Sequence, residues 1–336
     1  MKKLLIALLL LTILSSCKKE TPVVPLIIYD MKDDYMEDFE RRIVDNAEGL
    51  FETVTYDSQN SQVIQNEYIE RLIESSALLI VNPVDRLGAY TIIEKARSTN
   101  TPIIFINREP LSSDLALGDQ VYYIGANPIE SAILQAEIVM DLFGGNPDSL
   151  NSMDKNGDNI IQAVILKGQI GHQDAELRTE YVIKEIERNG YTLEVLEIMV
   201  ANFDMTTAET VMALLLEEYG QSIEVVISNN DAMAIGAIHT LVEQEYFVDT
   251  NENGVIERTS ETWIPVIGID GLDASIDLID SGYLYGTVIN DSESMAKAIV
   301  ALSQAILNGD DIHSIDYEII NDTYIWIAYQ KYTNED

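Results

Sequence analysis

The stretch "LIIYDMKDDYMEDFERRIVDNAEGLF", residues 26–51, changes its hydrophobic pattern after the first five residues. The opening run, residues 26–30, is apolar and contains β-branched side chains, which is typical of a strand buried on both faces of a parallel sheet. From residue 33 onward, the apolar residues recur at the spacing of one helical face. The stretch therefore predicts a strand followed directly by a helix, with Asp33 at the junction.

The same alternation of strand and helix patterns recurs along the whole chain. Seven further apolar runs share the character of the first, at residues 77–83, 102–108, 121–127, 162–168, 224–230, 264–270 and 285–291. Helical patterns lie between them, which indicates a parallel α/β architecture. Because about ten strands are more than one sheet accommodates comfortably, the sequence predicts two doubly wound parallel-sheet lobes.

Composition limits the kind of partner that this chain can have. The 336 residues are 47% hydrophobic, which is enough for one large domain or two moderate ones. The formal charge of −37 argues against nucleic acid as a partner, since such binding depends on Lys and Arg contacts with phosphates. An acidic chain favours cation binding, although most of its carboxylates are expected on a solvated surface.

The first 17 residues have the pattern of an export signal. A basic segment at residues 1–3 and an apolar run at 4–14, too short to span a bilayer, precede "LSSC", which ends at Cys17. The small residues before this single cysteine resemble a bacterial lipobox. They predict a lipoprotein signal peptide over 1–16, acylation of Cys17 and a lipid-anchored tether over 17–25, on the outer face of a bacterial membrane. A plain signal peptide with an incidental cysteine is the alternative.

Polar residues stand at the carboxyl ends of the predicted strands in both halves of the chain. They are Asp33, Asn107, Asn230, Asp231, Asp270 and Asn290. Ligands of open α/β sheets bind at that edge, although each residue by itself is also a common turn former. Carboxylates and amides suit a ligand with several adjacent hydroxyls. The set lacks the nucleophile and base of most enzymes; a glycoside hydrolase, which needs only two carboxylates, stays open on chemistry alone.

The segment "KGQIGHQDAELRTEYV", residues 167–182, carries a second polar group at the start of a predicted helix. Asp174 and Arg178 are four residues apart and so share a helical face, and His172 lies just before them. This pattern fits a helix cap with a surface ion pair. It fits equally well a cluster of ligands for sugar hydroxyls at the cleft.

The segment "DKNGDNIIQ", residues 154–162, has the oxygen-bearing side chains of a calcium loop at alternate positions. Such a loop normally closes with a bidentate carboxylate at position twelve, which here is Ile165. The segment is therefore either an ordinary polar turn or a calcium loop that a carboxylate elsewhere in the chain completes.

Several segments closely resemble the galactose/glucose-binding proteins, which are substrate-binding components of ABC sugar importers. They are "YDSQNSQVIQNEYIERL", "DAELRTEYVIKEIERNGY", "EVVISNNDAMAIGA" and "GTVIND", and the resemblance extends from about Leu26 to about Asn321. It implies the type I periplasmic binding protein fold, with a first lobe of residues 26–125 plus 292–324 and a second of 126–291 plus 325–336. A three-strand hinge near Gly125, Asn290 and Trp326 would join them.

The resemblance also implies which residues bind the sugar. Matched position by position, the polar ligands are Asp33, Asn107, His172, Asp174, Arg178, Asn230, Asp270 and Asn290. Two rings sandwich the sugar in the family, usually Phe and then Trp, and Tyr35 and Phe203 match them here. Both substitutions keep a ring face for the apolar side of a pyranose. The prediction is therefore a monosaccharide site for glucose, galactose or both, with the preference left open.

In the family a distant glutamate completes the calcium loop, and Glu224 matches it here. The ligands implied are the side chains of Asp154, Asn156, Asp158, Gln162 and Glu224, and the carbonyl of Ile160. Position six, normally Gly because a positive φ is needed, is Asn159, and Asn is the next best residue there. Oxygen ligands without His or Cys favour structural Ca²⁺ over zinc.

A second loop, "FVDTNENGVIERTSE" at residues 247–261, is longer than the family's usual connection. Its candidate ligands at positions one, three, five, seven and nine are Asp249, Asn251, Asn253, the carbonyl of Val255, and Glu257. Position six is Gly254, position twelve is Ser260, and Glu261 lies one step beyond. The loop is either an Asn/Gly-rich turn or a second, weaker calcium site.

The mechanism implied is binding by closure of two lobes around one sugar, in a monomer that presents the closed form to an ABC permease and catalyses no reaction. A sugar sensor that reports to a chemoreceptor or two-component receptor is the main alternative. The effector domain of a sugar-responsive repressor shares the fold, but the export signal counts against it.

Overall fold

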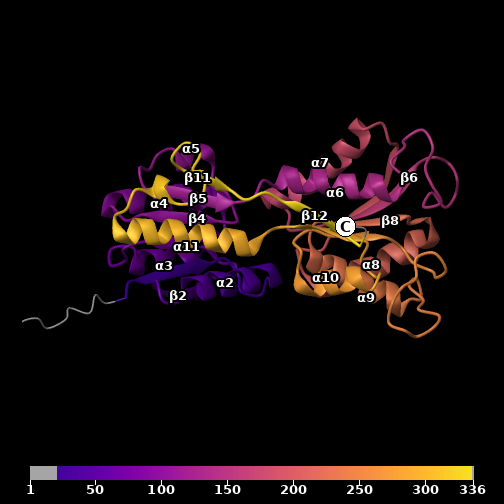
Figure 1. The fold of residues 1–336 in the computed structure, drawn as a ribbon, viewed down its shortest axis with the longest axis horizontal. Coiled ribbons are helices and arrows are strands. Elements are labelled where there is room, and N and C mark those ends of the chain that lie inside the picture. Colours follow the sequence, from indigo (N-terminus) through magenta and orange to yellow (C-terminus); the bar gives the residue numbers. More distant parts are fainter. Residues whose placement is uncertain (1–20, 335–336) are drawn as a thin grey trace, which may run out of the picture.

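The computed structural model describes residues 21–334 and divides them between two lobes that follow one another along the long axis of the molecule (Figure 1). The predicted signal peptide and Cys17 lie outside the described residues. Within residues 21–334, no helix combines the length and the apolar character needed to cross a membrane. Each lobe is built on one six-stranded sheet.

The sheet of the first lobe is parallel throughout and has the strand order β11-β5-β4-β3-β1-β2. Its strands are β1 (Val23–Ile28), β2 (Glu52–Asp57), β3 (Leu79–Val81), β4 (Ile103–Ile106), β5 (Val121–Gly125) and β11 (Tyr324–Trp326). Its helical segments are α2 (Asp34–Ala47), α3 (Gln62–Leu72), η1 (Arg86–Gly88), α4 (Ala89–Thr99), α5 (Ser112–Leu115), α11 (Ser292–Asn308) and η3 (Ile312–Ser314).

The sheet of the second lobe has the order β12-β10-β9-β8-β6-β7. Its strands are β6 (Ile161–Lys167), β7 (Leu193–Val200), β8 (Val225–Ser228), β9 (Val266–Ile267), β10 (Gly286–Ile289) and β12 (Gln330–Thr333). Its helical segments are α6 (Pro128–Leu142), α7 (Gln173–Arg188), α8 (Met205–Tyr219), η2 (Gly220–Ser222), α9 (Asp231–Glu243) and α10 (Asp273–Asp280). Only the edge strand β12 runs antiparallel to its neighbour, β10, and such an edge is common in doubly wound sheets. The predicted fold class is confirmed.

The chain crosses between the lobes three times. The crossings join β5 to α6, β10 to α11, and β11 to β12. The yellow strands β11 and β12 show the third crossing in Figure 1. Two boundaries differ from the predicted ones. Strand β1 begins at Val23, inside the predicted tether, and β11 pairs with β5 in the first sheet, so residues 325 and 326 belong to the first lobe. Both differences arise because paired backbone, rather than composition, decides where a strand extends.

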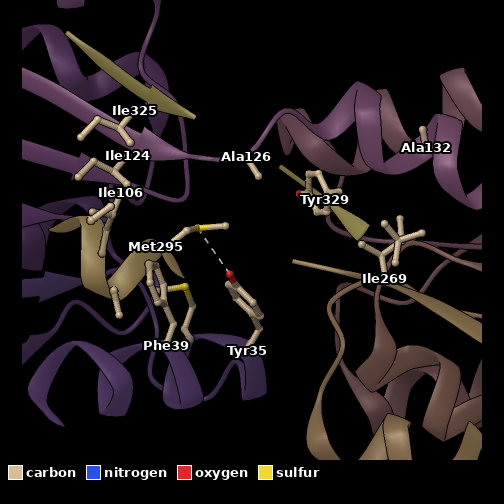
Figure 2. Close-up of a cluster of buried hydrophobic side chains, with 14 of the residues drawn as sticks. Tyr35, Phe39, Ile106, Ile124, Ala126, Ala132, Ile269, Met295, Ile325 and Tyr329 are labelled. Atoms are coloured by element: carbon tan, nitrogen blue, oxygen red, sulfur yellow. Dashed lines mark hydrogen bonds between the residues drawn. The ribbon is translucent and has the colours of Figure 1, made fainter. Parts of the chain in front are cut away.

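Side chains from both lobes meet in one hydrophobic cluster where the crossings occur (Figure 2). Phe39 of α2 and Met295 of α11 lie on the first-lobe side, and Ile269 and Tyr329 lie on the second-lobe side. Ala126, in the first crossing, lies between them. The crossings therefore run through packed apolar side chains rather than through a loose linker.

Candidate functional site

A narrow cavity of about 30 Å³ lies between the lobes, where strands of both sheets end. All ten residues predicted to bind sugar line it: Asp33, Tyr35, Asn107, His172, Asp174, Arg178, Phe203, Asn230, Asp270 and Asn290. Tyr29 and Met36 complete the lining. The structure thus brings together polar strand ends that lie far apart in the sequence.

Asp33 caps helix α2 and faces the cavity from the first lobe. Its Oδ1 accepts a hydrogen bond from the Met36 backbone N–H at 3.2 Å, and its Oδ2 accepts one from the Tyr29 hydroxyl. Burial raises the pKa of Asp33, although these hydrogen bonds favour the carboxylate. The guanidinium carbon of Arg108 lies 3.6 Å from the centroid of the Tyr29 ring, within the range of a cation–π contact. Asp33 is thus a pocket acceptor held in one orientation.

Arg108 and Glu109 bond to the second lobe beside the cavity. Arg108 Nη1 donates to the Val84 carbonyl at 2.6 Å, within the first lobe, and Nη2 donates to Gln169 Oε1 at 3.4 Å, across the cleft. Gln173 Nε2 donates to Glu109 Oε2 at 3.3 Å, also across the cleft. These side chains therefore join the lobes when the lobes are close together, as they are in this structure.

Arg178 lies at the centre of the second-lobe half of the cavity and is 4% exposed. Its Nη1 donates to the Asn229 carbonyl at 2.7 Å, and its Nη2 donates to the Tyr329 hydroxyl at 3.1 Å. Carboxylate oxygens of Asp174 and Asp270 lie 3.7 and 3.9 Å from the guanidinium nitrogens. Burial acts to lower the pKa of Arg178, but attraction to Tyr329 and the two carboxylates raises it overall. Asp174 and Arg178 are therefore an ion pair that lines the cavity. Their spacing thus reflects both an ion pair, as one interpretation had it, and a position at the cleft, as the other had it.

Asp270 is held in an unusual backbone conformation, with φ at 139°. Burial raises the pKa of its carboxyl well above the usual value, and the neighbouring Arg178 only partly opposes this. The following turn is fixed by Asp231, which accepts the backbone N–H groups of Gly271 at 2.7 Å and Leu272 at 3.1 Å. Asp231 itself does not line the cavity. Of the six polar residues at strand ends, it is therefore the one that holds the turn after Asp270 without facing the cavity.

His172 and Phe203 form an edge-to-face pair at the rim of the second lobe. Their ring centroids are 5.1 Å apart and their planes are 77° apart. His172 Nδ1 accepts the backbone N–H of Asp174 at 3.1 Å and so caps α7. Burial, followed by the nearby positive charge of Arg108, lowers the pKa of His172 well below its usual value. The ring is therefore neutral, and with Nδ1 accepting, its proton is on Nε2 and available for donation.

Three further lining residues sit at or near the ends of elements. Asn230 caps α9, and its side chain accepts the Met233 N–H at 3.0 Å. Asn290 directly follows β10. The Tyr35 hydroxyl donates to the Asn290 carbonyl at 3.4 Å, a contact that the family's usual phenylalanine could not make. Tyr35 therefore contacts a hinge segment as well as the cavity.

The lining combines carboxylate acceptors, amide and guanidinium donors, and aromatic faces. Each sugar hydroxyl both donates and accepts, so alternating acceptors and donors can pair it completely. The aromatic rings suit the apolar C–H face of a pyranose. Among the described residues that line the cavity there is no serine or cysteine. The arrangement is that of a binding site for a polyhydroxylated ligand.

The first predicted calcium loop is folded around its own first carboxylate. Asp154 accepts the backbone N–H of Gly157 at 2.7 Å and that of Asn159 at 2.8 Å. Asp158 accepts the N–H of Ile160 at 2.9 Å. Asn159 has φ at 62°, which is the left-handed conformation predicted for position six. The loop backbone therefore has the turn that a calcium loop requires at this position.

Glu224 fastens this loop to strand β8. Its two carboxylate oxygens accept the backbone N–H groups of Lys155 at 2.5 Å and Gln162 at 3.2 Å. Burial raises the pKa of Glu224, and the neighbouring charge of Asp154 adds to this. Gln162 is buried, and its Oε1 accepts no hydrogen bond. A cation would supply the partner that this oxygen lacks, so the residues fit an oxygen-coordinated metal ion.

The acidic side chains of the loop do not by themselves form a metal cluster. Within residues 21–334, no group of three or more His, Cys, Asp or Glu side chains is arranged to hold a metal ion. Asn156 Nδ2 and Gln162 Nε2 both donate to Asp158, at 3.0 and 3.1 Å. Calcium at this loop would therefore depend on amide and carbonyl oxygens, including that of Ile160, as much as on carboxylates.

The second predicted calcium loop repeats the hydrogen bonding of the first. Asp249, at position one, accepts the N–H groups of Asn253 at 3.2 Å and Gly254 at 2.7 Å. Asn253 in turn accepts the N–H of Val255 at 2.8 Å, as Asp158 accepts that of Ile160 in the first loop. The loop is thus an ordered turn closed on its first carboxylate.

Glu261 takes the place in this second loop that Glu224 takes in the first. Its carboxylate accepts the N–H groups of Thr250 at 2.6 Å and Glu257 at 2.9 Å, which are positions two and nine. Glu257 also accepts from Asn251 Nδ2 at 2.7 Å. Glu261, one residue beyond Ser260 at position twelve, therefore closes the loop through hydrogen bonds. The loop residues are mostly exposed.

Sequence reasoning missed several residues that shape the cavity. Those that line it or bond directly to its lining are Tyr29, Met36, Asn82, Arg108, Asn229 and Tyr329. Arg108 and Asn229 stand beside predicted residues at strand ends, which is a signal that could have identified them. Tyr329 lies in the third crossing, and nothing in the sequence around it indicates that its hydroxyl meets Arg178.

Comparison with known proteins gives a consistent result. The model of a family described as "Periplasmic binding protein domain" matches residues 24–311. The chain is 37% identical over 286 residues to the D-galactose/methyl-galactoside binding periplasmic protein MglB of Haemophilus influenzae, covering 84% of this chain and 80% of that protein. It is 24% identical over 260 residues to the ribose import binding protein RbsB of Bacillus subtilis, covering 77% and 72%.

Solved structures share the fold over almost the entire chain. An ABC transporter solute binding protein from Bacillus halodurans with bound myo-inositol aligns with a TM-score of 0.73 and 26% identity, covering 95% of this chain and 97% of that one. A periplasmic solute binding protein from Actinobacillus succinogenes with bound D-allose has a TM-score of 0.76 at 16% identity, covering 94% and 98%. The second likeness concerns the fold alone.

Proposed function

The chain belongs to the periplasmic binding protein family, and from this premise we propose that it binds galactose or glucose in the interlobe cavity and delivers the sugar to an ABC permease. Proteins of this family bind solutes and are not enzymes. The observation that carries the proposal is the convergence of all ten matched positions on one cavity between the lobes. The 37% identity to a galactose-binding relative supports a hexose rather than another polyol.

Binding by closure follows from how the cavity is divided between the lobes. Asp33 and Asn107 come from the first lobe, and Asp174, Arg178 and Asp270 from the second, so a sugar meets all of them only when the lobes are together. Closure excludes water and pairs each hydroxyl. A ligand that lacks one hydroxyl then leaves a buried polar group unpaired, which selects against it. The closed form offers the permease a surface from both lobes.

Attachment to the membrane is part of the same proposal. Acylation of Cys17, which precedes the described residues, would hold the protein at the outer face of a bacterial membrane through lipid alone. Strand β1 begins at Val23, so the connection between the lipid and the fold would be only about five residues long, or about 15–18 Å when extended. The fold would then stay close to the membrane that contains its permease.

Calcium completes the proposal as a structural cofactor. Asp154, Asn156, Asp158, the carbonyl of Ile160, Gln162 and Glu224 would hold it in the first loop. Calcium supplies positive charge that lets these oxygens face one another and that pins the loop to β8. The second loop, with Asp249, Asn251, Asn253, the carbonyl of Val255 and Glu257, would hold a weaker ion, and the bonds of Glu261 support that residue as its closing carboxylate.

Isothermal titration calorimetry of the protein from residue 18 onward, with galactose, glucose, ribose and xylose, tests the proposed ligand. We expect saturable binding of one galactose or glucose, and a loss of affinity of about 100-fold in Asp270→Ala, because that change removes a charge-assisted acceptor. Asp280→Ala, an exposed carboxylate on α10, is the matched control and should bind as the wild type does. Binding of a pentose alone, or of none of the four sugars, would contradict the proposal.

A further inference from the structure

A fully buried amide, Asn82, supports the cavity residue Asn107 from behind. Asn82 directly follows strand β3, has no exposed surface and does not line the cavity. Its Nδ2 donates to Asn107 Oδ1 at 3.1 Å and to the Ile106 carbonyl at 3.3 Å. The two asparagines thus follow adjacent strands of the first sheet and bond side chain to side chain.

The Ile106 carbonyl fixes which way both amides are turned. A backbone carbonyl only accepts hydrogen bonds, so the atom of Asn82 beside it must be the donor Nδ2. The atom of Asn107 that faces Nδ2 must then be an acceptor, Oδ1. The remaining side-chain atom of Asn107, its Nδ2, carries two N–H donors and is left for a ligand in the cavity that Asn107 lines.

The backbone of Asn107 is fixed as firmly as its side chain. Its φ is 59°, in the left-handed region, and the buried hydroxyl of Tyr123 donates to its carbonyl at 2.8 Å. Its N–H donates to the Ile124 carbonyl at 3.3 Å. Asn82 Oδ1, in contrast, is buried and accepts no hydrogen bond. A buried acceptor without a hydrogen bond lowers the stability of the fold. The presence of an asparagine at position 82 is therefore explained by the hydrogen bonds that its Nδ2 donates rather than by a contribution to stability.

We propose that Asn82 is a positioning residue that makes Asn107 a hydrogen-bond donor to the sugar, and thereby helps to determine which hydroxyl pattern the cavity accepts. Asp33, which caps α2 after strand β1, is an acceptor, and both Asp33 and Asn107 line the first-lobe half of the cavity. A sugar hydroxyl that meets Asp33 donates to it, whereas a hydroxyl that meets Asn107 accepts from it. This inference rests on the proposed function, since it assumes that the ligand is a sugar.

A double-mutant cycle measured by calorimetry with galactose and glucose tests the inference. Asn82→Leu keeps most of the side-chain volume and removes the donor, and we expect it to weaken sugar binding about ten-fold. Asn107→Ala should weaken binding about 30-fold. The double variant should bind no more weakly than Asn107→Ala, because a residue that acts only through Asn107 has no effect once that side chain is gone.

A set of monodeoxygalactoses gives a readout that a purely structural role would not change. The wild type should discriminate against the sugar that lacks the hydroxyl bound by Asn107, and Asn82→Leu should lose that discrimination alone. Thr101→Val is the matched control, since it removes another buried hydrogen bond of the first lobe, from Thr101 Oγ1 to the Ile73 carbonyl at 2.9 Å, away from the cavity. The control should lower thermal stability and leave affinity and discrimination unchanged.

The outcomes separate this inference from the proposed function. Additive losses in the cycle, or unchanged discrimination in Asn82→Leu, overturn the inference while the wild type still binds sugar. A wild type that binds no sugar overturns both. If Asn82→Leu does not fold, Asn82→Ala removes the same donor to Asn107 Oδ1 with a smaller side chain. Its loss of affinity must likewise vanish in the Asn107→Ala background, and persistence of that loss contradicts the inference.

Discussion

At the scale of single residues, the sequence identified the side chains that line the cavity better than those that hold them in place. Asp33, Asn107 and Asp270 could be predicted because strand ends of an α/β sheet converge at one edge. Asn82 and Tyr329 could not, because each acts through a contact with a residue 25 or 151 positions away. Such contacts depend on how strands are ordered and where the chain returns, which local patterns do not encode.

The affinity for galactose is expected to fall as the pH is lowered through the raised pKa of Asp270. Burial raises the pKa of Asp270 well above its usual value, and burial also raises that of Asp174. A sugar hydroxyl donates to the ionised carboxylate, so affinity is complete above the raised pKa and is lost as the pH falls through it. Burial lowers the pKa of His172 well below its usual value, which keeps a positive charge off this ring near neutral pH. Calorimetry in buffers of different ionisation enthalpy should detect proton release on binding.

The stability of the sugar-free protein should change with pH in the opposite direction. A carboxyl whose pKa is higher in the fold than in the unfolded chain stabilises the fold below the unfolded pKa, and this contribution disappears as the pH rises through the folded pKa. Asp270→Asn should remove much of both effects, because it cannot ionise. An affinity for galactose that is independent of pH in the wild type would contradict the assignment of Asp270 as an ionised acceptor.

Gly168→Ala is expected to weaken sugar binding about ten-fold with little effect on folding. A Cβ at Gly168 would lie 2.1 Å from Phe203 Cζ, so the ring must move away from the position it now occupies at the cavity. Calorimetry measures the affinity, and thermal unfolding measures the stability. Gly88→Ala is the control, since its Cβ would meet Gln62 at an ordinary 3.4 Å. Unchanged affinity in Gly168→Ala would show that the position of the Phe203 ring does not matter to binding.

At the scale of elements, buried strands were predictable and exposed ones were not. Strands β4 and β8 are continuous apolar runs that are buried along their entire length. Strands β2 and β7 lie at the outer edges of the two sheets and include polar residues, with most positions partly exposed. Their sequences "ETVTYD" and "LEVLEIMV" therefore lack the signal of a buried parallel strand. The crossing strands β11 and β12 are too short to carry a pattern.

Removal of calcium is expected to lower the stability of the second lobe. A ligand present at 1,000 times its dissociation constant adds about 4 kcal/mol to the free energy of unfolding, so chelation should lower the melting temperature by several degrees and calcium should restore it. Glu224→Gln should abolish this response, since Glu224 joins the loop to β8. Exposed Glu217→Gln is the control. A melting temperature that is indifferent to both chelator and calcium would contradict the first site.

The ratio of calcium to protein after exhaustive dialysis distinguishes the two loops. We expect about one ion per chain at low calcium and about two in millimolar calcium, because extracellular-type loops bind in that range. Glu261→Gln should remove the weaker ion only, since that carboxylate bonds to positions two and nine of its loop. A ratio of one calcium ion per chain that persists in millimolar calcium would contradict the hypothesis of a second calcium site.

At the scale of the whole molecule, the sequence predicted two lobes and three crossings, and the crossings determine how the lobes can move. All three run through one hydrophobic cluster that contains Phe39, Met295, Ile269 and Tyr329. Because packed cores resist continuous deformation, the motion between open and closed forms is expected to be a rotation at the crossings rather than a change within either lobe. Side chains such as Arg108 and Gln169, on opposite sides of the cleft, would separate in that motion.

Small-angle X-ray scattering should detect closure as a smaller radius of gyration when galactose is added. The bonds from Arg108 to Gln169 and from Gln173 to Glu109 exist only with the lobes together, so the sugar-free protein should sample more open forms. Gln169→Ala with Gln173→Ala should increase the radius of gyration of the sugar-free protein while leaving thermal stability nearly unchanged. An identical scattering curve with and without sugar would contradict closure.

The late return of the chain to the first lobe has a consequence for how the protein is made. Helix α11, which packs on α2, and edge strand β11 come from residues 292–326, after nearly all of the second lobe, and β12 of the second lobe comes last. A chain that emerges from a membrane in order from its N-terminus therefore cannot finish one lobe while the other is still being translocated. Both are completed by the last few dozen residues to arrive. A chain that lacks these last residues has neither lobe complete. Export of this protein therefore yields either the entire binding unit or incomplete chains that are degraded.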